Sequence, residues 1–231
     1  MKRLILFCAG LAVAIGHTYA TATGYSIGIN FAADEPNFAG LGLINTDVAG
    51  VPAVAQGNWN NTTGQSSVAF DPFTDESGVA GTATGMILEW TSNGTWSSTG
   101  RGEENNGFAV GPDRELMTGY LDTGDATTTE IKVSGIPASL TASGYDIYVY
   151  SLGGVAGRGG TVRILEWDGI SAAGGVIASK LVTSPTSPAT YVEDNGLDHT
   201  TSGNYVRFAG LDSSSIIIQA STAINGLTRM P

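Results

Sequence analysis

Short runs in which apolar and polar residues alternate recur along the whole sequence. Residues 25–31 carry an apolar side chain at every second position, and residues 86–90 and 145–149 repeat this pattern. A period of two places alternate side chains on the same face of a β-strand, so that one face can be buried. The alternation therefore predicts half-buried strands and an all-β fold.

Further strands are predicted at residues 131–133, 162–167, 205–210 and 216–218. The three consecutive isoleucines of the last run favour a strand that is covered on both faces. Glycine supplies 33 of 231 residues, and clusters of Gly, Asn, Ser, Thr and Pro separate the runs. Such frequent turns favour antiparallel sheets over long helices. Residues 41–75 alternate poorly and are predicted to form a long excursion over the surface.

The first twenty residues have the features of a secretory signal peptide. Lys2 and Arg3 precede an apolar run over residues 4–15, and the segment closes on small residues at 18–20. A membrane-spanning helix needs about twenty apolar residues, more than this run supplies. We therefore expect a secreted protein, extracellular or periplasmic, whose single mature domain of residues 21–231 has no membrane span.

Cleavage after this segment would leave 8 basic and 21 acidic residues, a formal charge of −13 instead of −11, and no cysteine. Nucleic acids and anionic membrane surfaces attract clustered Lys and Arg, so neither is an expected partner. Without disulfides, the fold would depend on core burial. His199 would be the one remaining histidine, which excludes a zinc site built from His and Cys.

Two motifs resemble catalytic or phosphate-binding signatures but lack the required context. Residues 24–28 match the G-x-S-x-G pattern, yet Ser26 falls inside the first predicted strand instead of between a strand and a helix. The glycine-rich residues 153–160 lack the lysine and the following helix of a phosphate-binding loop, so a hairpin connection is predicted. No catalytic residue is assigned, although Arg158 at the hairpin tip remains a candidate ligand contact.

The four tryptophans fall into two classes. Trp90 and Trp167 lie in alternating runs and are predicted to pack in the core or on a sheet face. Trp59 lies in an asparagine-rich segment and Trp96 in a segment rich in Ser and Thr. An exposed indole beside amides offers an apolar face and hydrogen-bonding groups to a sugar ring. The alternative is that each of these two indoles folds back and pins its own loop.

Carboxylates are numerous, but sequence spacing within loops does not show which of them lie close together. Glu103 and Glu104 share a Gly- and Asn-rich loop with Asn105 and are the first candidates if the protein cleaves glycans. Oxygen-rich turns suit a structural calcium ion, although no calcium-loop motif is present, and no other cofactor is expected. The candidate ligand-binding residues are Trp59, Asn60, Asn61, Trp96, Glu103, Asn105 and Arg158.

Several short motifs together resemble malectin-like and related galactose-binding-like domains. They are the opening residues 27–31, the closing residues 223–227 and the Tyr-Val-Tyr motif at 148–150 ahead of a glycine-rich hairpin. Residues 56–61 and 116–122 are also similar to segments of uncharacterised secreted proteins from environmental bacteria. The resemblance implies a jelly-roll β-sandwich, the fold of many carbohydrate-binding modules, whose first and last strands lie close together.

Three functions follow, in order of preference. The first is a non-catalytic, secreted carbohydrate-binding or glycan-associated domain, which an exposed Trp59 or Trp96 lining a concavity would favour. The second is a structural or matrix protein of the cell exterior without a small ligand, which buried tryptophans would favour. The third is a glycan-cleaving enzyme, which needs two carboxylates facing each other across a cleft. The sequence predicts neither the glycan nor the oligomeric state.

Overall fold

The computed structural model describes only part of the chain. The described residues are 5–7, 11–14, 26–35, 42–70, 73–79, 85–100, 105–124, 127–155, 158–168, 170, 174–198 and 200–222. Within them the secondary structure consists almost wholly of strands, most of them in antiparallel pairs. The predicted all-β class is confirmed.

The larger sheet has six strands in the order β12-β11-β14-β9-β6-β5, and every pair is antiparallel. Three of these strands, β6, β9 and β11, were predicted from alternation, and β14 was predicted from its apolar run. Their bounds are β5 (Ser66–Phe70), β6 (Ile87–Thr91), β9 (Thr128–Ser134), β11 (Gly159–Glu166), β12 (Val176–Thr183) and β14 (Ile216–Ser221).

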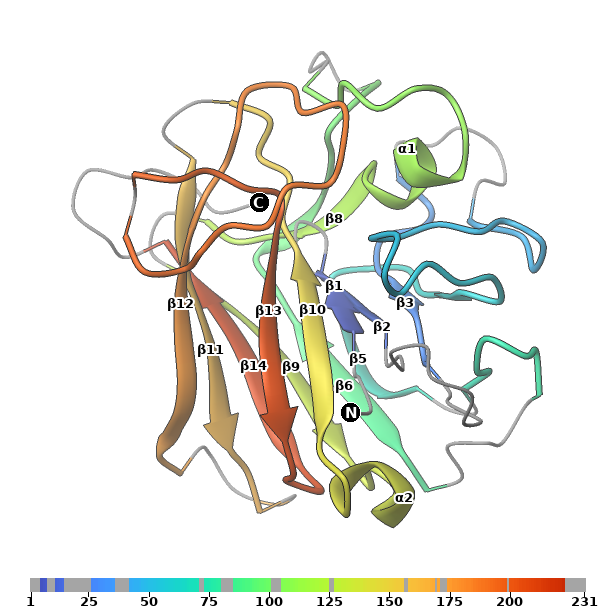
Figure 1. The fold of residues 1–231 in the computed structure, drawn as a ribbon, viewed down its shortest axis with the longest axis vertical. Helices are drawn as coiled ribbons and strands as arrows, with labels where there is room; N and C mark the ends of the chain where they lie inside the picture. Colours follow the sequence, from blue (N-terminus) through green and yellow to red (C-terminus); the bar gives the residue numbers. More distant parts are fainter. Residues whose placement is uncertain are drawn as a thin grey trace.

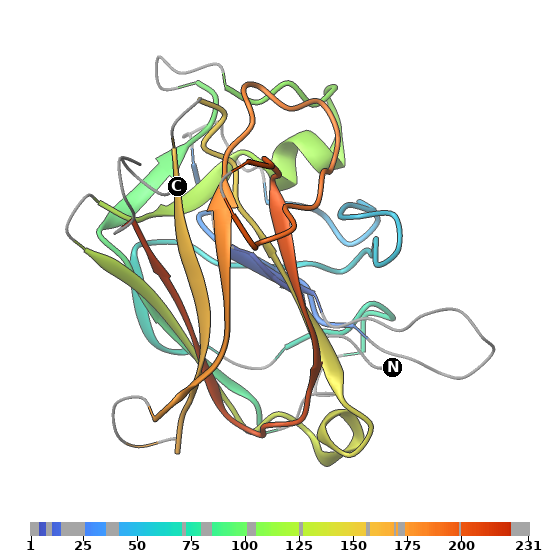
Figure 2. The same cartoon turned by 60° about the vertical axis from the view of Figure 1, so that its left-hand side comes forward.

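The second sheet has the order β13-β10-β1-β2. Its central strand β10 (Tyr145–Tyr150) pairs antiparallel with β13 (Tyr205–Leu211) and parallel with β1 (Ile5–Phe7), which is followed by β2 (Leu11–Ala14). Strands β10 and β13 lie in front of the larger sheet, so the molecule has two layers of strands (Figures 1 and 2). The apolar side chains of both sheets meet in the space between these layers.

Strands β1 and β2 lie within the predicted signal peptide, residues 1–20. The rest of that segment lies outside the described residues, as does the predicted cleavage position. Export and cleavage therefore stay predictions.

Two smaller pairs and two short helices complete the described structure. Strand β3 (Ile29–Asn30) pairs parallel with β4 (Asn60–Asn61), and β7 (Gly94–Ser97) pairs antiparallel with β8 (Gly119–Asp122). Helices α1 (Pro112–Leu116) and α2 (Ala138–Thr141) have five and four residues. Among the residues that the structure describes, no helix is long and apolar enough to cross a membrane.

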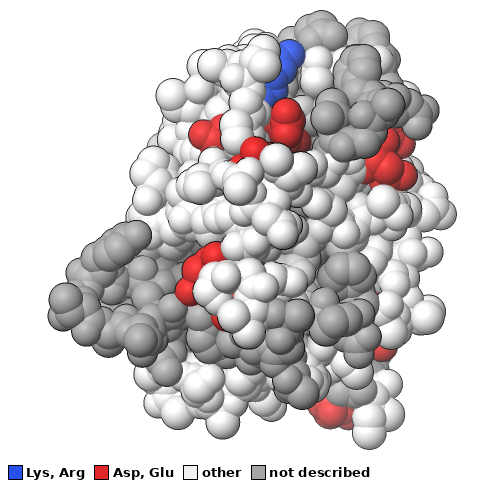
Figure 3. All heavy atoms as spheres, turned by 90° about the vertical axis from the view of Figure 1, so that its right-hand side faces the viewer, with Lys and Arg blue, Asp and Glu red and all other residues white. Residues whose placement is uncertain are grey.

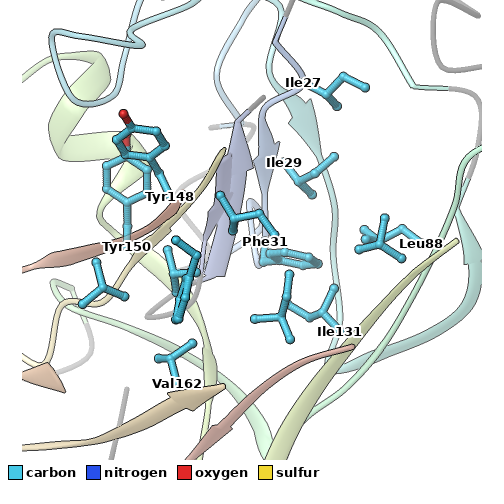
Figure 4. Packing of buried hydrophobic residues seen from close by; sticks show 14 of the residues in the cluster. Ile27, Ile29, Phe31, Leu88, Ile131, Tyr148, Tyr150 and Val162 are labelled. Atoms are coloured by element: carbon cyan, nitrogen blue, oxygen red, sulfur yellow. The ribbon is translucent and has the colours of Figure 1, made fainter. Parts of the chain in front are cut away.

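The core fills the space between the sheets. Ile131, Ile164 and Ile218 stand side by side on β9, β11 and β14 and are fully buried. Phe31 points toward the same interior as Leu88 and Ile131 (Figure 4). The apolar side chains of the alternating runs thus lie on the inner faces of both layers.

Two expectations need correction. Residues 41–75 are not a purely surface excursion, because they contain β4 and β5 and bury Leu43, Val51 and Val54 in the core. Residues 26–31 are buried on both faces, and only β3 within them pairs as a strand. In contrast, Ile216, Ile217 and Ile218 are at most 1% exposed, which confirms a strand covered on both faces.

Candidate ligand-binding groove

Trp59 lies in the core and not on the surface. Its side chain is only 4% exposed, and the indole Nε1 donates a hydrogen bond to the carbonyl oxygen of Gln56 at 2.8 Å. The ring packs directly against Gly28, where an added Cβ would lie 2.5 Å from Trp59 Cε3. The prediction of an exposed indole is wrong at this position, and the geometry agrees with the alternative of a loop-pinning tryptophan.

The amides that follow Trp59 are occupied by hydrogen bonds to the backbone. Asn60 Nδ2 donates to the carbonyls of Gly28 at 2.9 Å and Thr74 at 2.8 Å, and its Oδ1 accepts from the Thr74 N–H at 2.8 Å. Asn61 Oδ1 accepts from the Leu43 N–H at 3.1 Å, and its Nδ2 donates to the Leu43 carbonyl at 2.8 Å. Both side chains join distant backbone segments, which leaves them little capacity for a ligand.

The other predicted site residues lie away from this segment. Trp96, on β7, is 36% exposed and stands opposite Tyr120 of β8. The glycine-rich connection between β10 and β11 is not the predicted hairpin, because β10 belongs to one sheet and β11 to the other. Asn105 and Arg158 both contact this connection: Arg158 Nη1 donates to the Gly153 carbonyl at 3.2 Å, and Asn105 lies against Gly154. Glu103 lies outside the described residues. The structure therefore brings Asn105 and Arg158 close together.

Ser26 occupies a structural position next to a carboxylate. Its backbone N–H donates to Glu76, and its Oγ lies 3.4 Å from Glu76 Oε2. Burial raises the pKa of Glu76, and the hydrogen bonds from Ser26 oppose this shift only in part. The described residues directly after Ser26, 27–35, contain no helix, so Ser26 lacks the geometry of a nucleophile elbow.

A groove of about 300 Å³ lies on the larger sheet over strands β5, β6 and β9. Alternation turns Leu88 and Trp90 of β6 toward the interior, and it turns Glu89 toward the side that faces solvent. Val68 of β5, which is 88% exposed, forms part of the rim. The lining residues are Ser66, Ser67, Val68, Glu89, Trp90, Thr91, Glu130 and Lys132.

The strand register places three charged side chains on the floor of this groove. Glu89 stands opposite Lys132, and Glu130 stands opposite Thr91, so the two carboxylates are diagonal neighbours on adjacent strands. Glu130 Oε1 accepts a hydrogen bond from Gln219 Nε2 at 3.0 Å, which holds this carboxylate in place.

The ammonium group of Lys132 does not neutralise Glu89. Lys132 Nζ lies 5.8 Å from the ring centroid of Trp167, within the range of a cation–π contact. Glu89 forms no hydrogen bond or ion pair with any described residue. The groove therefore contains a half-exposed carboxylate whose hydrogen-bonding capacity the described part of the chain leaves unused.

Sequence reasoning missed Glu89, Glu130 and Lys132. Each is a single polar residue at an outward position of a strand, a pattern shared by any solvent-facing strand. The only available signal was the presence of Glu at positions 89 and 130, since nothing local showed that these strands are neighbours. The site depends on register, which is a tertiary property.

No metal centre is seen in the part of the chain that the structure describes. There, no group of three or more His, Cys, Asp or Glu side chains could hold a metal ion. A calcium ion stays a prediction.

The surface charge is distributed unevenly on the face that lies on the right-hand side of Figure 1. Among the described residues of this face, acidic side chains appear in several separate places and basic side chains in one (Figure 3).

Comparison with known proteins gives no match. No protein-family model, curated protein or solved structure matches this chain. The resemblance to malectin-like domains therefore rests on short motifs alone. The function has to be argued from the groove itself.

Proposed function

We propose that this chain is a secreted, non-catalytic carbohydrate-binding protein with a jelly-roll β-sandwich fold, and that the groove over β5, β6 and β9 holds the glycan. The observation that carries the proposal is the carboxylate of Glu89 on the floor of that groove, which forms no hydrogen bond or ion pair with a described residue. A carboxylate has two acceptor oxygens and binds neighbouring hydroxyl groups through charge-assisted hydrogen bonds. Sugars present such pairs of hydroxyl groups along each ring.

The remaining lining residues suit the same ligand. Ser66, Ser67 and Thr91 add hydroxyl groups, which both donate and accept hydrogen bonds. Val68 offers an exposed apolar surface to the C–H face of a sugar ring. The volume of about 300 Å³ is at the lower end of the range for ligand pockets, roughly 300–1,000 Å³, so a short stretch of glycan chain fits best.

The position of the carboxylates favours binding over cleavage. Glu89 and Glu130 are diagonal neighbours on one sheet face, a separation of roughly 7–8 Å between their backbones. Glycosidases place the two carboxyl groups on opposite sides of the scissile bond. Two carboxylates side by side on a groove floor can hold a sugar but do not flank a bond within it.

A structural role outside the cell is the second candidate. It is favoured by the burial of Trp59 and by the complete use of the Asn60 amide in backbone hydrogen bonds. In this case the polar loop segments only hold the fold together. The groove would then bind no small ligand.

Glycan-array screening of the folded chain tests the proposal. We expect a hit with the wild-type protein and loss of that hit with Glu89→Ala. The matched control is Glu193→Ala, which removes an exposed carboxylate from a loop that contacts the other sheet, beside Tyr205. Absence of any hit with folded wild-type protein would favour the structural role, and equal loss in both variants would remove the groove from the account.

A further inference from the structure

We infer that the glycan held in the groove carries free amino groups, as a chain of glucosamine does. This inference rests on the proposed function and names the class of its ligand. The relevant juxtaposition is that of Glu89 and Glu130, which share the groove floor with the single ammonium group of Lys132.

The floor of the groove has an excess of negative charge. Its lining includes two carboxylates and one ammonium group, and the ammonium lies over the Trp167 ring and forms no ion pair with Glu89. Solvent-facing strands commonly place opposite charges across from each other so that they pair. Here Glu89 and Lys132 have the register for such a pair and do not form it.

A ligand ammonium group fits between the two carboxylates. Glu130 Oε1 is occupied by Gln219, so Oε2 remains as an acceptor, and Glu89 is the diagonal neighbour of Glu130 on β6. An ammonium group has three donors, and its hydrogen bonds to carboxylates are stronger than those of a neutral hydroxyl. The ammonium group of Lys132 lies 5.8 Å from the ring centroid of Trp167, which does not line the groove, and it leaves the Glu89 carboxylate to a ligand.

The net charge of the whole chain also favours a cationic ligand. The formal net charge is −11. Such a field raises the local concentration of cationic ligands and opposes uronic acids and sulfated sugars. Amino sugars, unlike neutral ones, would benefit from both the local and the overall charge.

The test compares glucosamine oligomers with fully N-acetylated oligomers of the same length, by calorimetry at a pH at which the amine is protonated. Both ligands share ring and linkage, and they differ only in the charge and the acetyl group at the nitrogen of each sugar unit. We expect the free amine to bind about three- to tenfold more tightly, the effect of one or two half-exposed ion pairs. Salt at about 1 M, where the Debye length is about 3 Å, should abolish most of this difference.

Variants separate local recognition from general attraction. Glu89→Gln keeps the shape of the side chain and should remove the preference for the amine, whereas Lys132→Met should increase it. Glu193→Gln removes the same charge elsewhere and should change nothing; if it reduces the preference as much as Glu89→Gln does, the inference is wrong. Equal or tighter binding of the acetylated oligomer also overturns the inference but leaves the proposed function standing. If neither these oligomers nor any arrayed glycan binds, the proposed function fails as well.

Discussion

The segment around Trp59 and the groove on the larger sheet contain similar groups, an indole with neighbouring polar side chains, but use them in opposite ways. Around Trp59 the indole N–H and the Asn60 amide all bond to backbone atoms within the protein. In the groove, the Glu89 carboxylate bonds to no described residue. Polar composition alone therefore does not identify a binding site; unused hydrogen-bonding capacity next to a concavity is the better indicator.

The largest expected effect is on the buried indole. Trp59→Ala removes a side chain that is 4% exposed and should lower the free energy of unfolding by about 3–5 kcal/mol, measured by chemical denaturation. Trp96→Ala is the comparison variant, because Trp96 is 36% exposed, and it should lower the free energy by a smaller amount, about 2 kcal/mol. Similar losses in the two variants would contradict the core position of Trp59.

The amide beside it should have the next largest effect. Asn60→Ala leaves the Gly28 carbonyl and both backbone groups of Thr74 without this partner, and we expect a loss of about 2–3 kcal/mol. Asn93, which is exposed and makes one long side-chain hydrogen bond to Asp122, provides the control, with an expected change within about 0.5 kcal/mol. If Asn60→Ala were as mild as Asn93→Ala, the Asn60 amide would be available for a ligand after all.

The Trp59 region should also respond to pH through Glu76, whose backbone carbonyl accepts from Asn58. Burial raises the pKa of Glu76 above its ordinary value of 4.5, so the native state binds the proton more tightly than the unfolded chain. This contribution to stability is complete below the unfolded pKa and is lost as the pH rises through the native pKa. Wild-type stability relative to Glu76→Gln should therefore fall with rising pH across that window; a rise would contradict the assigned direction.

The smallest expected effect on stability is in the groove. Glu89→Gln removes no hydrogen bond or ion pair to a described residue and should change the free energy of unfolding by no more than about 0.5 kcal/mol. A loss of more than 1 kcal/mol, measured as for Trp59→Ala, would show that Glu89 supports the fold. In that case the contrast between the two regions would disappear.

The four inner strands of the larger sheet, together with β10 and β13 of the second sheet, could be predicted from the sequence because burial forces their apolar patterns, whereas β1 and β2 were predicted to be part of a signal peptide. Leu88, Ile131 and Ile164 must face the core, and their strands follow from that requirement. Strands β5 and β12 were not predicted, since they are the edge strands of the larger sheet and most of their side chains are partly or fully exposed. An exposed strand lacks the periodic burial that makes alternation visible.

The site could not be predicted for a different reason. Glu89 and Glu130 are about forty positions apart in the sequence, and only the pairing of β6 with β9 makes them neighbours. The burial of Trp59 likewise depends on a distant residue, since Gly28 provides the space for its ring. Local composition describes the chemistry of each segment but not the surface that it meets.

The most direct test of the central claim is a glycan array probed with three proteins: the wild type, Glu89→Gln and Trp59→Phe. Trp59→Phe keeps an aromatic ring in the core but loses the hydrogen bond to the Gln56 carbonyl and part of the buried ring volume, a smaller loss than that in Trp59→Ala, so the protein should stay folded. If the ligand lies in the groove, the wild-type hits persist unchanged in Trp59→Phe and become weaker in Glu89→Gln. Hits that keep their full strength in Glu89→Gln and disappear in a folded Trp59→Phe would contradict the account.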